Sequence, residues 1–258
     1  MRPYAYTNQP LSQHIKGVVE WSGRMLEKSG YTKTGVRRLK YAGVNLENLD
    51  TLNEAILAAA IFHDVGKAIE YYQSQFNEKG ECVKPKRPDG RPTFRLHEVL
   101  SAVYFDRFVS KHLDWPAELK ILAVLAVLNH MHALRDFGRI IDLFNPEENI
   151  VSQEIRRVIF GARIAADDLD SLAETIAGYG FMYEDVKKEL TPPVTRYDVI
   201  SLGKKLQEFE FIKSSRLYVL LLLPVLVGDV LDASESRRDE ETTASRRAFI
   251  EELRMCLR

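Results

Sequence analysis

Residues 56–67 read ILAAAIFHDVGK, and this stretch decides how the rest of the chain is interpreted. It begins as an apolar run typical of a buried helix and ends with His63 and Asp64, followed by Gly66 and Lys67. Burying an imidazole and a carboxylate costs free energy unless a partner satisfies them. A metal ion can satisfy both, because one cation accepts both ligands. The alternative is that His63 and Asp64 form a surface pair at the end of the helix.

The composition is that of an ordinary globular protein without a strong charge bias. The 258 residues are 45% hydrophobic and 28% charged with a formal net charge of -1, so any nucleic-acid binding must come from a local basic surface. Two cysteines, Cys82 and Cys256, predict neither a disulfide framework nor a cysteine-rich zinc site. The N-terminus lacks the apolar segment of a signal peptide, and the longest apolar run, 217–228, is too short to span a bilayer. We expect a soluble, cytoplasmic protein without membrane association.

Helical periodicity dominates the chain and alternating strand patterns are nearly absent, which predicts an all-α fold. We expect Gly30 to end a first helix that opens near Leu11, and residues 31–49 to form a polar connection. Thr51 and Glu54 suggest a capping box for the helix that carries His63 and Asp64. Asp114 is expected to be the N-cap, and Pro116 to lie in the first turn, of the helix near 119–128. Further helices are expected from His97 and near 119–128, 151–160, 163–177, 183–190, 198–212 and 216–232, with a connection over 136–150.

We expect a single domain over residues 1–258. Its core would span about residues 11–234, and residues 235–258 would form a charged C-terminal helix.

Residues 79–95 have the clearest loop composition in the chain, and we call this segment the basic loop. Three prolines and two glycines forbid long regular structure, and six Lys or Arg against two acids leave a local charge of about +4. The segment is either a solvated loop or a flap that contacts phosphates, because long loops in compact domains are often functional. The candidate phosphate contacts are Lys84, Lys86, Arg87 and Arg91.

Five of the six histidines lie at the ends of expected helices or beside carboxylates, and only His112 is predicted to be an unrelated surface histidine. A helical bundle can direct side chains from several helices to one interior point. Asp229 follows an almost entirely apolar run, so leaving it unpaired would be costly. Asp232 is expected to face water instead. The five candidate ligand histidines are His14, His63, His97, His130 and His132.

This order of residues resembles the HD superfamily of metal-dependent phosphohydrolases, and more closely the HD nucleases of type I CRISPR interference. The resemblance covers about residues 11–234 and implies a helical HD-domain bundle with additional helices. The motifs that carry it are LSQH at 11–14, HDVGKA at 63–68 followed by YQ at 72–73, LHEVLSA at 96–102, NHMH at 129–132 and LVGDVLDAS at 226–234.

The resemblance implies a metal-dependent nuclease that hydrolyses phosphodiester bonds of single-stranded DNA, or of RNA, with one or two divalent ions. The donor types favour Mn, Mg, Ni, Co or Fe over a structural zinc. Asp64 would bridge the two ions, Lys67 would contact the phosphate and Ser101 would approach the substrate. The implied ligands are His14, His63, Asp64 and Asp229 for one ion, and His97, His130 and His132 with Asp64 for the other.

The chain departs from the family in one motif and lacks one common fusion. Met131 separates two histidines that are usually adjacent, and positions i and i+2 of a helix point about 200° apart. His130 and His132 can therefore serve one metal only if the helix ends or bulges there. Gly66 and Lys67 do not belong to a P-loop, because residue 61 is Ile and residue 68 is Ala. We expect a stand-alone nuclease subunit that works with a separate helicase and effector complex.

Two other interpretations remain open at the level of sequence. One is an HD phosphohydrolase that acts on nucleotides or cyclic dinucleotides, which would not require His97 or the His130 and His132 pair. The other is a non-catalytic helical scaffold that retains a relic site. Retention of every ligand type argues against the scaffold.

Overall fold

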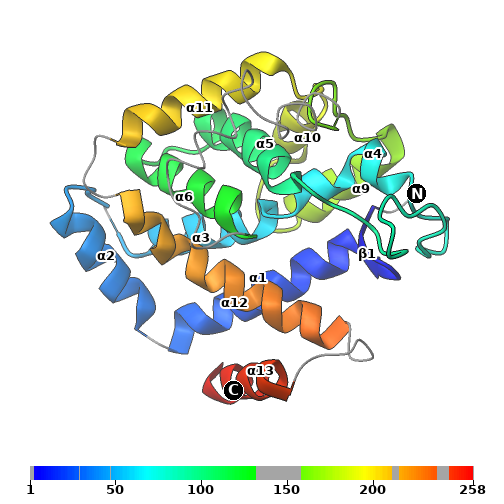
Figure 1. Ribbon diagram of the computed structural model, residues 1–258. Coiled ribbons are helices and arrows are strands. Elements are labelled where there is room, and N and C mark those ends of the chain that lie inside the picture. Colours follow the sequence, from blue (N-terminus) through cyan, green and yellow to red (C-terminus); the bar gives the residue numbers. More distant parts are fainter. Residues whose placement is uncertain are drawn as a thin grey trace.

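Helices make up nearly all the regular structure of the computed structural model, which describes residues 3–28, 30–46, 48–131, 158–210, 215–236 and 244–257 (Figure 1). The prediction of an all-α fold is confirmed, with one short hairpin added at the N-terminus. The elements are β1 (Tyr4–Tyr6), β2 (Gln9–Pro10), α1 (Leu11–Lys28), α2 (Tyr31–Tyr41), α3 (Asp50–Phe62), the 3-10 helix η1 (Val65–Ala68), α4 (Glu70–Gln73), α5 (His97–His112), α6 (Ala117–Asn129), α9 (Ala166–Ala177), α10 (Tyr183–Leu190), α11 (Arg196–Glu210), the 3-10 helix η2 (Ser215–Tyr218), α12 (Val219–Ser236) and α13 (Ala244–Leu257).

The helix α3 lies at the centre of the bundle. Every residue from 58 to 69 is buried, so the stretch that ends α3 and forms η1 is almost entirely shielded from water. Helices α1, α12, α6 and α5 all pack against α3. On the other side of α5, α10 and α11 complete the bundle, and α13 covers the crossing of α1 and α12 (Figure 1).

The helices α1 and α12 cross closely because a glycine lies at their contact. A Cβ atom on Gly228 would lie 2.5 Å from the carbonyl oxygen of Val18 and 2.8 Å from Oγ of Ser22. Pro224 interrupts the backbone hydrogen bonding of α12, since it cannot donate to the carbonyl of Leu220. The hydroxyl of Tyr31 donates to that carbonyl instead, at 2.9 Å, and so attaches α2 to α12.

Three local predictions are wrong. Residues 31–49 contain the helix α2, which buries Thr32, Gly35 and Leu39 at helical spacing beneath a charged outer face. Thr51 lies inside α3 and does not cap it, because Oδ1 of Asn48 accepts hydrogen bonds from the backbone N–H and the hydroxyl of Thr51. Helix α6 begins at residue 117 with Pro116, not Asp114, at its N-cap.

The structure confirms four other predicted helices and leaves two predicted segments wholly or mostly undescribed. The helices expected over 163–177, 183–190, 198–212 and 216–232 are confirmed with small shifts of their ends. The connection at 136–150 and most of the helix at 151–160 lie outside the described residues. In the part of the chain that the structure describes, no helix combines the length and apolar character needed to cross a membrane.

We predict that Gly228→Ala destabilises the protein although alanine favours helix formation. The added methyl group would overlap the backbone of α1, and overpacking of this kind costs about 1–3 kcal/mol. The matched control is Gly23→Ala in α1, where a Cβ atom would meet nothing within 4 Å. This control should gain up to about 1 kcal/mol from helix propensity. Urea unfolding followed by circular dichroism measures both, and equal stability of the two variants would contradict the close crossing.

Candidate metal centre

Three histidines are oriented by their own backbone. His63 and His130 follow the last residues of α3 and α6, and His97 is the first residue of α5. In each, Nδ1 faces a carbonyl oxygen three residues earlier, and since a carbonyl only accepts, Nδ1 must carry the proton. The free Nε2 atom of each ring then points into the interior. The acceptors are the carbonyl oxygens of Ala60, Val127 and Phe94, at 2.7, 2.7 and 2.5 Å for His63, His130 and His97.

His14 reaches the same interior point from the first turn of α1, with a carboxylate in place of a carbonyl. Its Nδ1 lies 2.6 Å from Oδ2 of Asp232, and both residues are buried. The prediction that Asp232 faces water is therefore wrong. The missed signal is spacing, because Asp232 lies one helical turn after Asp229 and shares its face of α12.

The carboxylate of Asp64 lies between two sets of imidazoles. Its Oδ2 is 3.0 Å from Nε2 of His14 and 3.5 Å from Nε2 of His63. Its Oδ1 is 2.9 Å from Nε2 of His97 and 3.3 Å from Nε2 of His130. Each oxygen thus faces a different pair of histidines, which is the arrangement that a bridging carboxylate requires.

Two groups of side chains are close enough to hold a metal ion. The first group is His14, His63 and Asp229, and the second group is Asp64, His97 and His130. In the first group, Oδ1 of Asp229 lies 3.4 Å from Nε2 of His14. Six of the seven sequence-predicted ligands therefore meet, from five helices or their ends. The seventh, His132, lies outside the described residues.

The position where α6 ends decides whether the motif interrupted by Met131 can direct a histidine at the centre. The helix ends at Asn129, and His130 and Met131 lie in a turn, so the condition that the helix ends at this motif is met. His130 points inward with 3% exposure, whereas Met131 is 51% exposed.

The donor set fits a divalent cation. Both carboxylate oxygens of Asp64 are buried without a hydrogen-bond partner of acceptable geometry. In the neutral rings with the proton on Nδ1, two Nε2 lone pairs face each other at 3.1 Å between His97 and His130. A cation between such lone pairs removes their repulsion and satisfies the carboxylate. Imidazole and carboxylate donors without thiolate suit Mn, Fe, Co, Ni or Mg, and the chemistry of the site does not distinguish among them.

Burial and neighbouring charges shift the pKa values of the side chains in this centre in different directions. Burial would raise the pKa of Asp64, but Lys67, His63 and His97 hold it well below its usual range, so the carboxylate is ionised. Burial lowers the pKa of His63 to about 3. Burial also opposes protonation of His14, but the carboxylates of Asp232 and Asp64 outweigh this and raise its pKa to about 9. A cation that binds His14 would therefore displace the proton on Nε2 and leave the one on Nδ1.

Lys67 faces both the centre and the space outside it. Its Nζ lies 2.5 Å from Oδ2 of Asp64 and 5.1 Å from the centre of the Phe94 ring. Gly66, just before it, lets η1 approach α5, because a Cβ atom there would lie 2.3 Å from the carbonyl oxygen of His97. The ammonium is held at the mouth of the centre.

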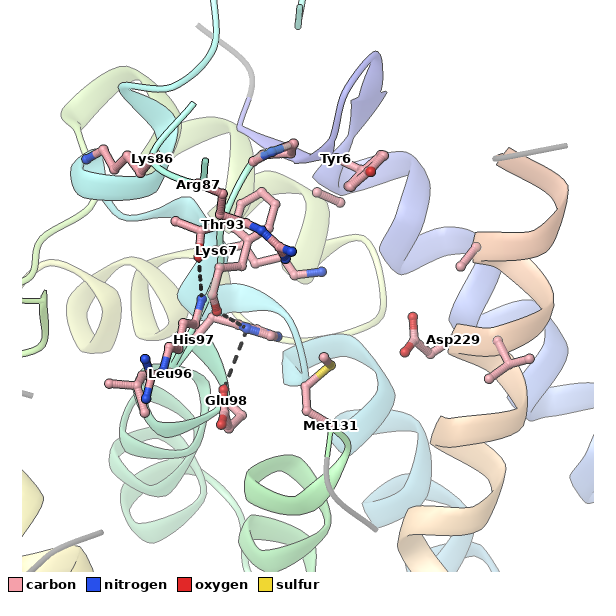
Figure 2. Close-up of a pocket in the computed structure, with 16 residues that line it drawn as sticks. Tyr6, Lys67, Lys86, Arg87, Thr93, Leu96, His97, Glu98, Met131 and Asp229 are labelled. Atoms are coloured by element: carbon pink, nitrogen blue, oxygen red, sulfur yellow. Dashed lines mark hydrogen bonds and ion pairs between the residues drawn. The ribbon is translucent and has the colours of Figure 1, made fainter. Parts of the chain in front are cut away.

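A pocket of about 730 Å³ opens from the centre toward the basic loop (Figure 2). Figure 2 shows Lys86 and Arg87 on one side of this pocket and Asp229 and Met131 on another. Tyr6 of the N-terminal hairpin also lines it, and no sequence motif marks that residue. The pocket therefore joins two of the candidate metal ligands, His97 and Asp229, to basic side chains.

The predicted substrate contacts divide into three kinds. Lys86 and Arg87 line the pocket, whereas Lys84 and Arg91 are exposed and do not belong to its lining. Ser101 is fully buried, and its Oγ accepts the backbone N–H of Gly66 at 2.8 Å. We therefore assign Ser101 a structural role in joining α5 to η1, because its hydroxyl does not reach the pocket.

The remaining histidine was predicted to be an unrelated surface residue, and it does lie away from the centre. His112 is half-buried, however, and its Nε2 lies 3.2 Å from Oε1 of Glu189. Nδ1 lies 3.3 Å from Oδ2 of Asp185. His112 thus joins α5 to α10.

Comparisons with known proteins agree with this geometry. No family model matches the chain. The chain is 28% identical to a CRISPR-associated endonuclease Cas3-HD from Saccharolobus solfataricus over 247 residues, covering 94% of this chain and 93% of that protein. Its fold is similar to that of a CRISPR-associated Cas3 HD domain protein from Methanocaldococcus jannaschii, with a TM-score of 0.52 and 18% identity over 89% of this chain and 99% of that one. The resemblance to CRISPR-associated HD nucleases that the motifs indicate is confirmed, as is the HD-type fold.

We predict that Mn²⁺ stabilises the protein through Asp64. At a hundred times the dissociation constant, the ion should raise the melting temperature by about 5–10 °C, and EDTA should reverse the rise. Asp64→Asn removes the charge between the two groups and should abolish most of this shift. Asp114→Asn, at an exposed position, serves as the control and should keep it. An equal shift in both variants would contradict a metal site at Asp64.

Proposed function

We propose, from its similarity to the CRISPR-associated Cas3-HD proteins, that this chain is a metal-dependent nuclease that hydrolyses phosphodiester bonds of single-stranded DNA, with RNA as an alternative substrate. One observation carries the proposal. Four imidazoles and two carboxylates converge on one centre, and two of these ligands, His97 and Asp229, line a pocket that residues of the basic loop also line. A scissile phosphate placed there would contact both cation ligands and basic side chains.

The candidate ligands divide into two sets that share one carboxylate. His14, His63, Asp64 and Asp229 would hold one ion. Asp64 would also serve a second ion with His97 and His130, and His132 is a further candidate ligand from the sequence. Two divalent cations, when bound, supply a water of lowered pKa and stabilise charge on the oxygen that leaves.

The side chains of this protein would contribute positioning and charge. The histidine rings are held by backbone and carboxylate acceptors, so their Nε2 atoms need little reorganisation. Lys67 combines a contact to Asp64 with a place on the pocket wall, where its ammonium can neutralise the charge of a phosphate. Asp64 and Lys67 are therefore the residues we assign to catalysis.

The similarity to Cas3-HD proteins and the motifs also support a setting for this activity. We infer that residues 1–258 form one HD-type nuclease domain that acts in the cytoplasm in CRISPR interference. A separate CRISPR-associated helicase would unwind DNA, and an effector complex would recruit the nuclease. Mixing the protein with a cognate helicase and effector complex should extend cleavage from single strands to a targeted duplex.

We predict that Asp64→Ala abolishes cleavage and leaves the fold intact. Labelled single-stranded DNA, RNA, deoxynucleoside triphosphates and a cyclic dinucleotide would each be incubated with Mn²⁺ or with EDTA. The wild type should degrade single strands only with the metal, and the variant should show only background cleavage with an unchanged circular dichroism spectrum. Turnover of nucleotides alone would favour the nucleotide phosphohydrolase, and no turnover at all would favour a relic scaffold.

We also predict that the two basic residues lining the pocket guide the strand. Lys86→Glu with Arg87→Glu should weaken binding of a single-stranded oligonucleotide and reduce the slope of log affinity against log salt by up to about 1.4. The matched control is Lys84→Glu with Arg91→Glu, which changes the charge of the same loop equally at exposed positions outside the pocket lining. Fluorescence anisotropy in EDTA measures both. Equal losses would show that only the total charge of the loop matters.

A further inference from the structure

His14 differs from the other three histidines in what fixes its ring. They use backbone carbonyls of their own helix ends or of the preceding turn, whereas His14 uses the carboxylate of Asp232, 218 residues later. Asp232 belongs to neither group of candidate ligands. Because a carboxylate accepts a proton from Nδ1, Nε2 is left for the interior, where it lies 3.0 Å from Oδ2 of Asp64.

The carboxylate of Asp232 is itself held by a second side chain. Nε2 of Gln9 donates to Oδ2 of Asp232 at 2.8 Å and to Oγ of Ser236 at 2.9 Å. Gly17 makes room for the other oxygen, because a Cβ atom on Gly17 would lie 1.8 Å from Oδ1 of Asp232. The orientation of Asp232 is therefore defined on both sides.

Gln9 is positioned by the N-terminal hairpin. Strand β1 is fixed by Gln73, whose Oε1 accepts the backbone N–H of Tyr4 at 2.9 Å and whose Nε2 donates to the carbonyl of Tyr4 at 3.0 Å. Nε2 of Gln73 also donates to the carbonyl of Lys67 at 2.7 Å. At the turn, the backbone N–H of Asn8 donates to the carbonyl of Gly80 in the basic loop at 2.8 Å. The hairpin thus contacts the basic loop, η1 and α12.

We propose that Asp232 is a positioning residue that holds His14 in the tautomer with its proton on Nδ1, and that Gln9 holds Asp232 in place, so that the hairpin controls metal binding at the first group. The inference rests on the metal centre of the proposed function. Partners of this kind typically change metal affinity by 10- to 100-fold, because they fix the ring and raise its basicity.

The test measures metal binding without reference to nuclease activity. Isothermal titration with Mn²⁺ would compare the wild type with Asp232→Ala, Asp232→Asn and Gln9→Met. We expect Asp232→Ala to weaken the first-group affinity by about 10- to 100-fold. Asp232→Asn keeps an oxygen acceptor and should restore part of the loss. Gln9→Met removes only the donor and should weaken binding by a smaller factor, and it remains informative if Asp232→Ala does not fold.

A second readout and a control separate positioning from general destabilisation. The visible spectrum of bound Co²⁺ should change in Asp232→Ala and Gln9→Met, because a misplaced imidazole alters the ligand field. Glu235→Gln, at an exposed residue of the same helix, should leave affinity and spectrum unchanged.

The outcomes separate this inference from the proposed function. Wild-type affinity and spectrum in Asp232→Ala and Gln9→Met, with strong binding by the wild type, would overturn the positioning role alone. Absence of metal binding by the wild type would overturn both the role and the metal centre.

Discussion

The buried carboxylate of Asp64 is the constraint on which the rest of the structure depends. An ionised carboxylate in the interior is costly, and neither of its oxygens has a hydrogen-bond partner of good geometry. Four imidazoles and the ammonium of Lys67 gather round it: His63 and Lys67 from the same segment, and His14, His97 and His130 from three other helices or their ends. The helical bundle can therefore be understood as the frame that brings these groups to one anion. A cation between them would complete the compensation that the side chains alone leave unfinished.

Close approach of backbones is the second requirement, and glycines meet it. Gly66 allows η1 to lie against the first turn of α5, which places Lys67 and Asp64 next to His97. Gly228 brings α12 onto α1, and Gly17 leaves room for the carboxylate of Asp232 beside His14. At all three positions a methyl group would overlap backbone or a ligand partner. These glycines set the distances between helices, so the ligands can be short and stiff side chains.

Periodicity predicted the helical fold, and the resemblance of the motifs to HD nucleases implied the six ligands that the structure brings together. An isolated polar group such as Asp229 is conspicuous where its neighbours must be buried. The hairpin, α2 and Asp232 were missed for a different reason. Asp232 is explained only by a partner 218 residues away and by the space at Gly17, and neither is visible in local periodicity. Helix α2 has a narrow buried stripe, so its charges conceal its period.

The two groups of candidate ligands differ in how they depend on the rest of the fold. In the second group, His97 and His130 are held by carbonyls three residues away, so their orientation is a property of local backbone. In the first group, His14 depends on a long-range contact to α12 and, through Gln9, on the hairpin. The hairpin bonds to the basic loop at Gly80, and the carbonyl of Phe94 in the same loop holds His97. A strand that displaces this loop would therefore act on both groups. These contacts give a physical route by which substrate binding and metal binding can depend on each other.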